Sequence, residues 1–315
     1  MTEPVLDSLT HGIIRDKRYE QTYRRDMRKQ RRRRLTRRIL AKLERTFTLP
    51  RLQKLNERLI ASGIKRPPIS VMLPVLNGVG RIEPLVAYLR AHLRDGDEIV
   101  IGVDSKCTDA SLAVCQRLAD TCFEVDNNAL TCNGMLGELA THCKHPWILR
   151  LDDDEWPEPA LFELLPALLH EAEQKNITHA KLPRLHLCLP KTDHAGALYW
   201  IDDGYLYPDY QLRLFKNNPS LLSFPGAIGH TNVSVAGKSL KLHSINLVHL
   251  NLAIYSPAQR TAKLRRYIDR HEGGWVHPVN EHALLWEKFN YQLHPYRPAD
   301  ATFAQALRAV IYPEA

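Results

Sequence analysis

The sequence predicts an α/β protein with a mostly parallel sheet, helices on both faces of it, and a basic helical extension at the N-terminus. Two observations lead to this fold class. From residue 69 onward, short apolar segments alternate with amphipathic segments across connections of a few residues, which is typical of parallel sheets. Basic residues gather in residues 1–66, which hold 20 Lys and Arg against 7 Asp and Glu, whereas the remainder holds 23 against 28. The positive charge therefore belongs to an appendage and not to the body.

The N-terminal extension has the pattern of two helices. Residues 15–45 are dense in Arg and Lys, and apolar residues recur there every four positions, which places them on one stripe of a helix. This apolar stripe consists of Leu35, Ile39, Leu43 and Phe47. Pro50 interrupts the pattern, and a second helix is predicted over residues 51–62, with Gly63 as its left-handed cap.

The body begins after residue 66 with regular alternation. Strands are predicted over residues 69–75, 98–103, 122–125 and 147–151, and helices over 83–93, 110–118 and 133–143. Beyond Pro157 the alternation weakens. There we expect helices over residues 160–175 and 257–271, and strands near 180–187, 211–215 and 245–250.

Composition excludes several classes of protein. The apolar fraction of 44% and the charged fraction of 25% are ordinary for a globular chain. No run approaches the ~20 apolar residues that span a bilayer, and no apolar stretch follows Met1. The six cysteines form no CxxC pair, so we interpret them as small core residues. We expect a cytoplasmic protein, with attachment to the inner face of the cytoplasmic membrane as one option.

An acidic run follows the strand predicted over residues 147–151. Asp152, Asp153, Asp154 and Glu155 are consecutive, and ligands of parallel sheets bind beyond the carboxyl ends of strands. Adjacent carboxylates repel one another unless a cation neutralises them. Hard oxygen ligands suit Mg²⁺ or Mn²⁺, which commonly bind one or two carboxylates together with substrate phosphates. The alternative is a solvated acidic loop or the first turn of a helix.

Two further segments follow strand ends. Asp104 closes the strand over residues 98–103, and this position suits recognition of a nucleobase or ribose, whereas Thr108 and Asp109 are explained by helix capping alone. The segment from Pro74 to Gly78 follows the first strand, where turn formation and ligand contact are equally good explanations. The motifs GxGxxG, GxxxxGK[ST], GxSxG and HExxH are absent.

Together these segments resemble the family 2 glycosyltransferases of the GT-A fold, whose sheet is Rossmann-like. The resemblance runs from about Ile69 to Tyr267. ISVMLPVLNG resembles the opening strand and turn of the family, EIVIGVDSKCTDAS its second strand, and WILRLDDDEWPE its Asp-x-Asp strand. YPDYQLRLF and the segment from Gly229 to His249 are similar to the branch that builds lipopolysaccharide cores. The implied domains are a basic extension (1–66), a GT-A domain (67–275, with a nucleotide-binding half 67–157 and an acceptor half 158–275) and a tail (276–315).

The resemblance implies a role for each candidate residue. Asp152, Asp154 and His249 would bind Mn²⁺ or Mg²⁺, a core or surface histidine being the alternative for His249. The donor nucleotide would contact Pro74, Asn77, Asp104, Asp152 and Lys263. Arg213 and Glu155 would act in catalysis, Arg213 near the leaving group and Glu155 on the acceptor side. Surface salt bridges are the alternative for Arg213 and Lys263.

The catalytic base is the weakest part of the resemblance. The branch has a carboxylate after its first histidine in this section, but Thr231 and Asn232 stand there. Asp209 is the favoured replacement, ahead of three other acids: Asp202, Asp203 and Glu281. The implied reaction is metal-dependent, inverting transfer of a hexose, from a nucleotide sugar that is expected to be UDP-linked, to a hydroxyl of a cell-envelope glycan or glycolipid.

Other functions remain open. A nucleotidyltransferase could share the sheet and the metal–diphosphate chemistry, but the segment from Asn77 to Arg81 is only a faint version of its Gly-rich loop. For residues 15–60 we favour an anionic membrane surface as the partner. The alternatives are packing on the acidic body or binding of nucleic acid, for which only Tyr19 and Tyr23 offer stacking aromatics.

Overall fold

A computed structural model describes residues 17–127, 132–189, 197–201, 206–224, 233–269, 281, 283–289 and 291–313. The chain divides into two compact units. Unit 1 contains residues 1–40, 184–209 and 249–297, and unit 2 contains residues 41–183, 210–248 and 298–315. The helical extension contributes to both units, and the expected boundaries at residues 66 and 275 stay a prediction.

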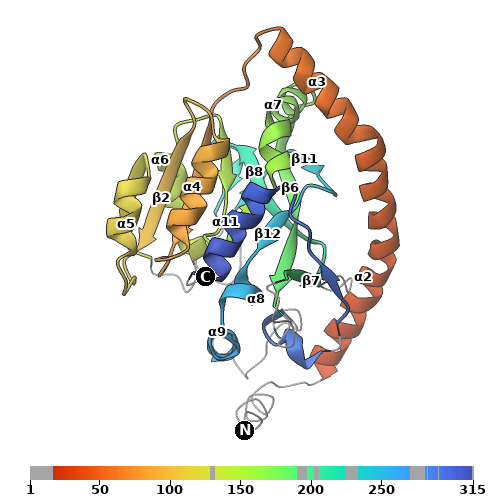
Figure 1. The fold of residues 1–315 in the computed structure, drawn as a ribbon, viewed down its shortest axis with the longest axis vertical. Helices are drawn as coiled ribbons and strands as arrows, with labels where there is room; N and C mark the ends of the chain where they lie inside the picture. The colour runs from red at the N-terminus through yellow and green to blue at the C-terminus, as the bar shows by residue number, and fades with distance from the viewer. Residues whose placement is uncertain are drawn as a thin grey trace. The chain divides into compact units, whose positions relative to one another are not determined.

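Unit 2 holds the predicted parallel sheet (Figure 1). Its strands are β1 (Ile69–Val75), β2 (Glu98–Asp104), β3 (Thr121–Val125) and β4 (Trp147–Arg150), in the order β4-β1-β2-β3 and all parallel. β8 (Asp209–Lys216) adds to β4 in the antiparallel direction. β1 and β2 are buried along their whole length, as expected for a sheet with helices on both faces.

Helices accompany these strands in unit 2. They are α4 (Ile82–His92), α5 (Ser111–Leu118), a 3₁₀ turn (Cys132–Met135) with α6 (Leu136–His142), α7 (Pro159–Gln174) and α11 (Ala301–Ile311). Leu136 and Leu139 of α6 share a core cluster with Met72 and Val100 of the sheet. α4 packs against α5 and α11, and Tyr88 of α4 contacts the rings of Trp156, Phe162 and Phe303. The predicted fold class is confirmed.

Shorter strands complete unit 2. They are β5 (Glu155–Pro157), β9 (Leu222–Ser223), β10 (Ser234–Val235) and β11 (Lys238–Lys241). β11 pairs in parallel with the first part of β6 (Ile177–Cys188). β6 also supplies unit 1, since residues from Arg184 onward belong there.

Unit 1 is built around a small antiparallel sheet. The end of β6 pairs with β7 (Tyr199–Ile201), which pairs with β13 (Leu293–Pro295). The remaining described elements are the last residue of β12 (Leu247–His249), α8 (Asn251–Ile254), α9 (Pro257–Asp269) and a 3₁₀ turn (Trp286–Lys288). Leu264, Leu284 and Leu285 form a core cluster with Tyr19 of the N-terminal helix.

The helical extension differs from the prediction at Pro50. α2 (Lys17–Leu43) continues without a break through a π-helical turn (Glu44–Thr48) into α3 (Leu49–Ala61). Pro50 lies in the first turn of α3, where its missing N–H costs nothing, and the wider π-turn before it avoids the clash of a mid-helix proline. Gly63 has a φ of 68°, and the N–H groups of Gly63 and Ile64 close the helix on Ile60 and Leu59. The predicted glycine cap is confirmed.

Among the described residues, no helix combines the length and the apolar character that crossing a membrane requires.

Candidate functional site

The carboxyl end of β2 positions Asp104 in unit 2. This side chain is buried and accepts hydrogen bonds from the backbone N–H of Lys106 at 2.9 Å and from Asn127 Nδ2 at 2.6 Å. Lys106 Nζ in turn donates to the carbonyl of Asn127. Asp104 therefore organises the loop after β2 and the end of β3, which the sequence did not predict.

The loop after β1 is tied to the loop after β2. Asn77 adopts a φ of 52°, and its side-chain oxygen accepts from the backbone N–H of Thr108 at 2.8 Å. Ser111 accepts from Gly78 N–H at 2.7 Å, and Asp109 accepts from Val79 N–H at 3.3 Å and from Ser111 N–H at 3.0 Å. Pro74 lies earlier, buried within β1, and the donor contacts expected of Pro74 and Asn77 stay predictions.

Gly78 allows the acidic run to approach the loop after β1. A Cβ on this residue would lie 2.7 Å from Val75 Cγ1 and 3.1 Å from Asp153 Oδ2. Asp153 pairs with Arg81 Nη2 at 2.7 Å. The pKa of Asp153 is raised to about 6, chiefly by burial; Arg81 opposes this shift, and the neighbouring Asp154 and Asp152 add to it. Asp153 thus has an internal partner in Arg81.

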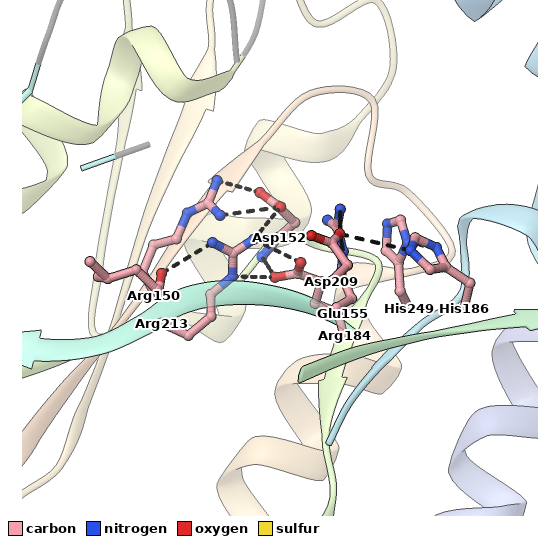
Figure 2. A network of polar contacts seen from close by, with 9 residues as sticks. Arg150, Asp152, Glu155, Arg184, His186, Asp209, Arg213 and His249 are labelled. Carbon is pink, nitrogen blue, oxygen red and sulfur yellow. Dashed lines mark hydrogen bonds and ion pairs between the residues drawn. The ribbon is translucent and has the colours of Figure 1, made fainter. Parts of the chain in front are cut away.

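Asp152 and Glu155 are held by two arginines of unit 2 (Figure 2). Arg150 donates to Asp152 Oδ1 at 2.6 Å and to Oδ2 at 3.2 Å. Arg213 of β8 donates to the two oxygens of Glu155 at 2.6 and 2.7 Å and to Asp152 Oδ2 at 3.1 Å. The Asp152 side chain is 29% exposed, whereas those of Glu155, Arg213 and Arg150 are 0%, 1% and 2% exposed.

This pairing decides how well a divalent cation fits the acidic run. Both oxygens of Asp152 already accept from a guanidinium, and Asp154 is buried. No group of three His, Cys, Asp or Glu side chains with metal-binding geometry occurs in the part of the chain that the structure describes. As arranged, Asp152 does not fit Mn²⁺ or Mg²⁺, and a role of Asp154 or His249 as a metal ligand stays a prediction.

Unit 1 contains a second polar cluster, also drawn in Figure 2. Arg184 of β6 pairs with Asp209 through Nε at 2.8 Å and through Nη2. His186 Nε2 lies 3.8 Å from Asp209, and the Nδ1 atoms of His186 and His249 are 2.9 Å apart in a hydrogen bond. Burial lowers the pKa of His186 to about 4, and Arg184 with its neighbours holds the pKa of Asp209 well below its usual range.

This second cluster bears on two predicted residues. Asp209, the favoured base, is ionised and 33% exposed, and its low pKa makes it a weak proton acceptor. His249 is buried and bonded to another histidine, so its imidazole is oriented by His186. The role of His249 as a metal ligand stays a prediction.

The other candidates have separate surroundings. Lys263 lies with its Nζ 5.7 Å from the ring of Tyr255, in a cation–π contact. Glu281 is fully buried and accepts from Tyr19 Oη, so it joins two segments of unit 1, the N-terminal helix and residues 249–297. Asp202, Asp203, Thr231 and Asn232 lie outside the described residues.

Sequence reasoning singled out Arg213 but missed three other arginines: Arg81, Arg150 and Arg184. Arg150 stands two residues before Asp152 at the end of a strand, so the period of two already places both side chains on one face. The partners of Arg81, Arg184 and His186 lie in other elements. No local sequence motif predicts these contacts.

Comparison with known proteins supports one segment. Residues 70–180 match the family model described as Glycosyl transferase family 2, which confirms the family 2 resemblance over that segment but does not address the lipopolysaccharide-core branch. No curated protein sequence matches the chain significantly.

Several solved structures are similar at low identity. The full Staphylococcus aureus TarS chain has 15% identity and a TM-score of 0.31, covering 41% of this chain and 24% of that one. TarS 1–349 with UDP-GlcNAc has 13% identity and a TM-score of 0.37, covering 78% and 71%. The mannosyltransferase PcManGT from Pyrobaculum calidifontis, with GDP-Man and Mn²⁺, has 13% identity and a TM-score of 0.42, covering 88% and 80%. The chain thus spans about a quarter of full TarS.

Proposed function

We propose that this chain is a family 2 type glycosyltransferase that moves a hexose from a UDP-linked donor to a hydroxyl of a cell-envelope glycan or glycolipid. The observation that carries the proposal is one edge of the unit 2 sheet. There the parallel strands β1, β2 and β4 end, and they present Asn77, Asp104 and the run from Asp152. Ligands of open α/β sheets bind at this edge, and the family match of residues 70–180 supports a nucleotide sugar.

Asp104 is the proposed nucleotide-recognition residue. It is an oriented carboxylate, because Asn127 Nδ2 and Lys106 N–H fix its two oxygens. The loop after β1 supplies Asn77, whose own amide is fixed by Thr108. Such preorganised groups bind a base and ribose without first paying the entropy of ordering.

The proposed reaction is direct displacement with inversion. The acceptor hydroxyl loses its proton to a base, its oxygen bonds to the anomeric carbon, and the bond from that carbon to the diphosphate oxygen breaks. Asp209 stays the candidate base because it lies in the segment YPDYQLRLF, although its pairing with Arg184 weakens it as a proton acceptor. Arg213 supplies positive charge beside Asp152 and Glu155. Lys263 remains a candidate cation for the leaving group.

Metal dependence was expected from Asp152, Asp154 and His249. A bound Mn²⁺ or Mg²⁺ would neutralise the diphosphate that leaves. No step is assigned to it here, because Asp152 is already paired with Arg150 and Arg213.

A membrane surface is the proposed partner of the helical extension. The apolar stripe stays exposed in the described helices, between 47% at Leu43 and 67% at Leu35. Arginines surround it, and each basic residue near an anionic leaflet contributes about 1 kcal/mol. An enzyme with a lipid-linked acceptor has use for such attachment.

The test of donor binding is a thermal-shift panel of UDP-, GDP-, CMP- and TDP-sugars. We expect stabilisation by a UDP-sugar and loss of this stabilisation in Asp104→Asn. The substitution replaces one accepting oxygen with an NH₂ group, which can only donate. Asp120→Asn, in an exposed pair with Arg90, is the matched control. The proposal fails if no nucleotide sugar stabilises the wild type, or if Asp104→Asn responds as the control does.

The membrane proposal is tested by vesicle sedimentation. Leu43→Ser/Phe47→Ser should lower binding to anionic vesicles about tenfold or more, because burial of two large apolar side chains is worth about 3 kcal/mol or more. Equal binding by this variant and the wild type would contradict insertion. Binding of RNA in place of vesicles, lost steeply with salt, would favour nucleic acid as the partner.

A further inference from the structure

Arginines form ion pairs with three acidic residues of the run: Asp152, Asp153 and Glu155. Asp152 accepts from Arg150 and Arg213, and Glu155 accepts from Arg213 through both oxygens. Asp153 accepts from Arg81. Three carboxylates and three guanidiniums therefore cancel in formal charge, which a run of four acids does not suggest when the sequence is considered alone.

Burial makes these ion pairs costly to break. The side chains of Arg150, Arg213 and Glu155 are almost completely removed from solvent, and Asp152 is the exposed member of the group. A buried guanidinium that loses its carboxylate keeps its charge, because arginine does not deprotonate in proteins. Taking Asp152 away from both arginines is therefore costly.

Binding of a divalent cation to Asp152 would disturb these pairs with Arg150 and Arg213. To bind either oxygen the cation must displace a guanidinium, or lie beside one and be repelled. The usual reason for metal at such a run, the repulsion between neighbouring carboxylates, has already been removed by Arg150, Arg213 and Arg81.

We propose that this chain binds its donor without a divalent cation, because the charge of Asp152 is already balanced by Arg150 and Arg213. Arg150 and Arg213 are the positioning residues that hold Asp152 in place. The inference rests on the proposed function only in taking a nucleotide sugar as the ligand.

The test compares wild type with Arg150→Met, which removes one guanidinium and keeps an unbranched side chain of similar length. Arg90→Met, in a surface pair with Asp120, is the matched control. Calorimetry measures the Kd of a UDP-sugar in EDTA and in Mn²⁺. We expect wild type and Arg90→Met to bind within twofold in the two conditions. Arg150→Met should bind at least tenfold more tightly in Mn²⁺, because Asp152 Oδ1 has become available.

Electron paramagnetic resonance of Mn²⁺ alone provides a readout that needs no donor. Wild type should leave the free Mn²⁺ signal unchanged, and Arg150→Met should reduce it. The inference is overturned if EDTA weakens donor binding to wild type more than tenfold, or if wild type sequesters Mn²⁺ and Asp152→Asn abolishes this. If no nucleotide sugar binds in either condition, the proposed function fails, and the Mn²⁺ signal still decides the inference.

If Arg150→Met does not fold, Arg150→Gln replaces it. Its shorter amide can donate to only one oxygen of Asp152, so it should show the same gain of Mn²⁺ dependence at a smaller size. No gain in a folded Arg150 variant would count against the proposal.

Discussion

Each unit of the molecule holds a carboxylate beside an arginine, and the two clusters differ in how they handle charge. Unit 2 holds an ionic network in which three of the four side chains are almost fully buried. Its members are Arg150, Asp152, Arg213 and Glu155. In unit 1, Arg184 and Asp209 are the charged pair, and Asp209 is partly exposed. The rest of that cluster is two buried imidazoles, of which His186 has a pKa of about 4.

The difference indicates different tasks. A buried and balanced ionic network is strongly destabilised when one member is removed, so it fixes geometry. The unit 1 cluster contains an ion pair with a partly exposed carboxylate, so removing one member leaves less uncompensated buried charge. We therefore interpret the unit 2 cluster as a rigid binding element and the unit 1 cluster as the more adaptable one.

The largest effect should follow from Arg213→Met. It leaves Glu155 charged, fully buried and without its two strongest donors. We expect a loss of about 3–5 kcal/mol in unfolding free energy, measured by urea denaturation. Arg213→Met/Glu155→Met should recover most of this loss. A single variant that loses less than about 1 kcal/mol would contradict the tightly coupled network.

The next effect concerns pH and His186. Its pKa is about 4 in the folded chain and 6.5 when unfolded, so the unfolded state binds the proton first as pH falls. Stability should therefore be lost between pH 6.5 and 4, by about 2 kcal/mol near pH 4.5. Denaturation at pH 7 and 4.5 measures it. His186→Asn should lack this loss, and an equal loss in both proteins would assign it elsewhere.

The smallest effect is expected from Arg184→Met. Because Asp209 is partly exposed, the loss in stability should stay at or below about 1 kcal/mol. Arg184 lowers the pKa of His186, so this variant should raise it, and Asp209→Asn should lower it. Titration of the imidazole by NMR measures both shifts. Shifts in the opposite directions would show that the two charges do not act on His186 as the geometry indicates.

Much of unit 2 could be predicted, because its signals are local. The strands over β1, β2 and β4 are apolar runs, and Gly63 ends α3 in the conformation that a glycine cap requires. Pro50 was misjudged, since only the π-turn before it shows how the helix continues. Whether a helix continues past a proline in this way depends on the i to i+5 backbone hydrogen bonds of the π-turn and not on residue type.

The strand ends were predicted, but the partners of the carboxylates there were not. Asp104 and Asp152 lie at the strand ends where the motifs placed them. Their partners come from other elements, as Arg213 does from β8 and Asn127 from beyond β3. A sequence motif shows which carboxylates are present, but tertiary pairing decides whether they face a metal, an arginine or a ligand.

The most direct test of glycosyl transfer is the identity of the products. Full-length chain is incubated with the UDP-sugar that stabilises it and with an envelope glycolipid extract, and the products are separated by chromatography. We predict release of UDP in equal amount to sugar incorporated into the glycolipid, with Asp104→Asn reducing both together. Conversion of the donor to UTP and sugar 1-phosphate on addition of pyrophosphate, without transfer to the glycolipid, would contradict the account and identify a nucleotidyltransferase.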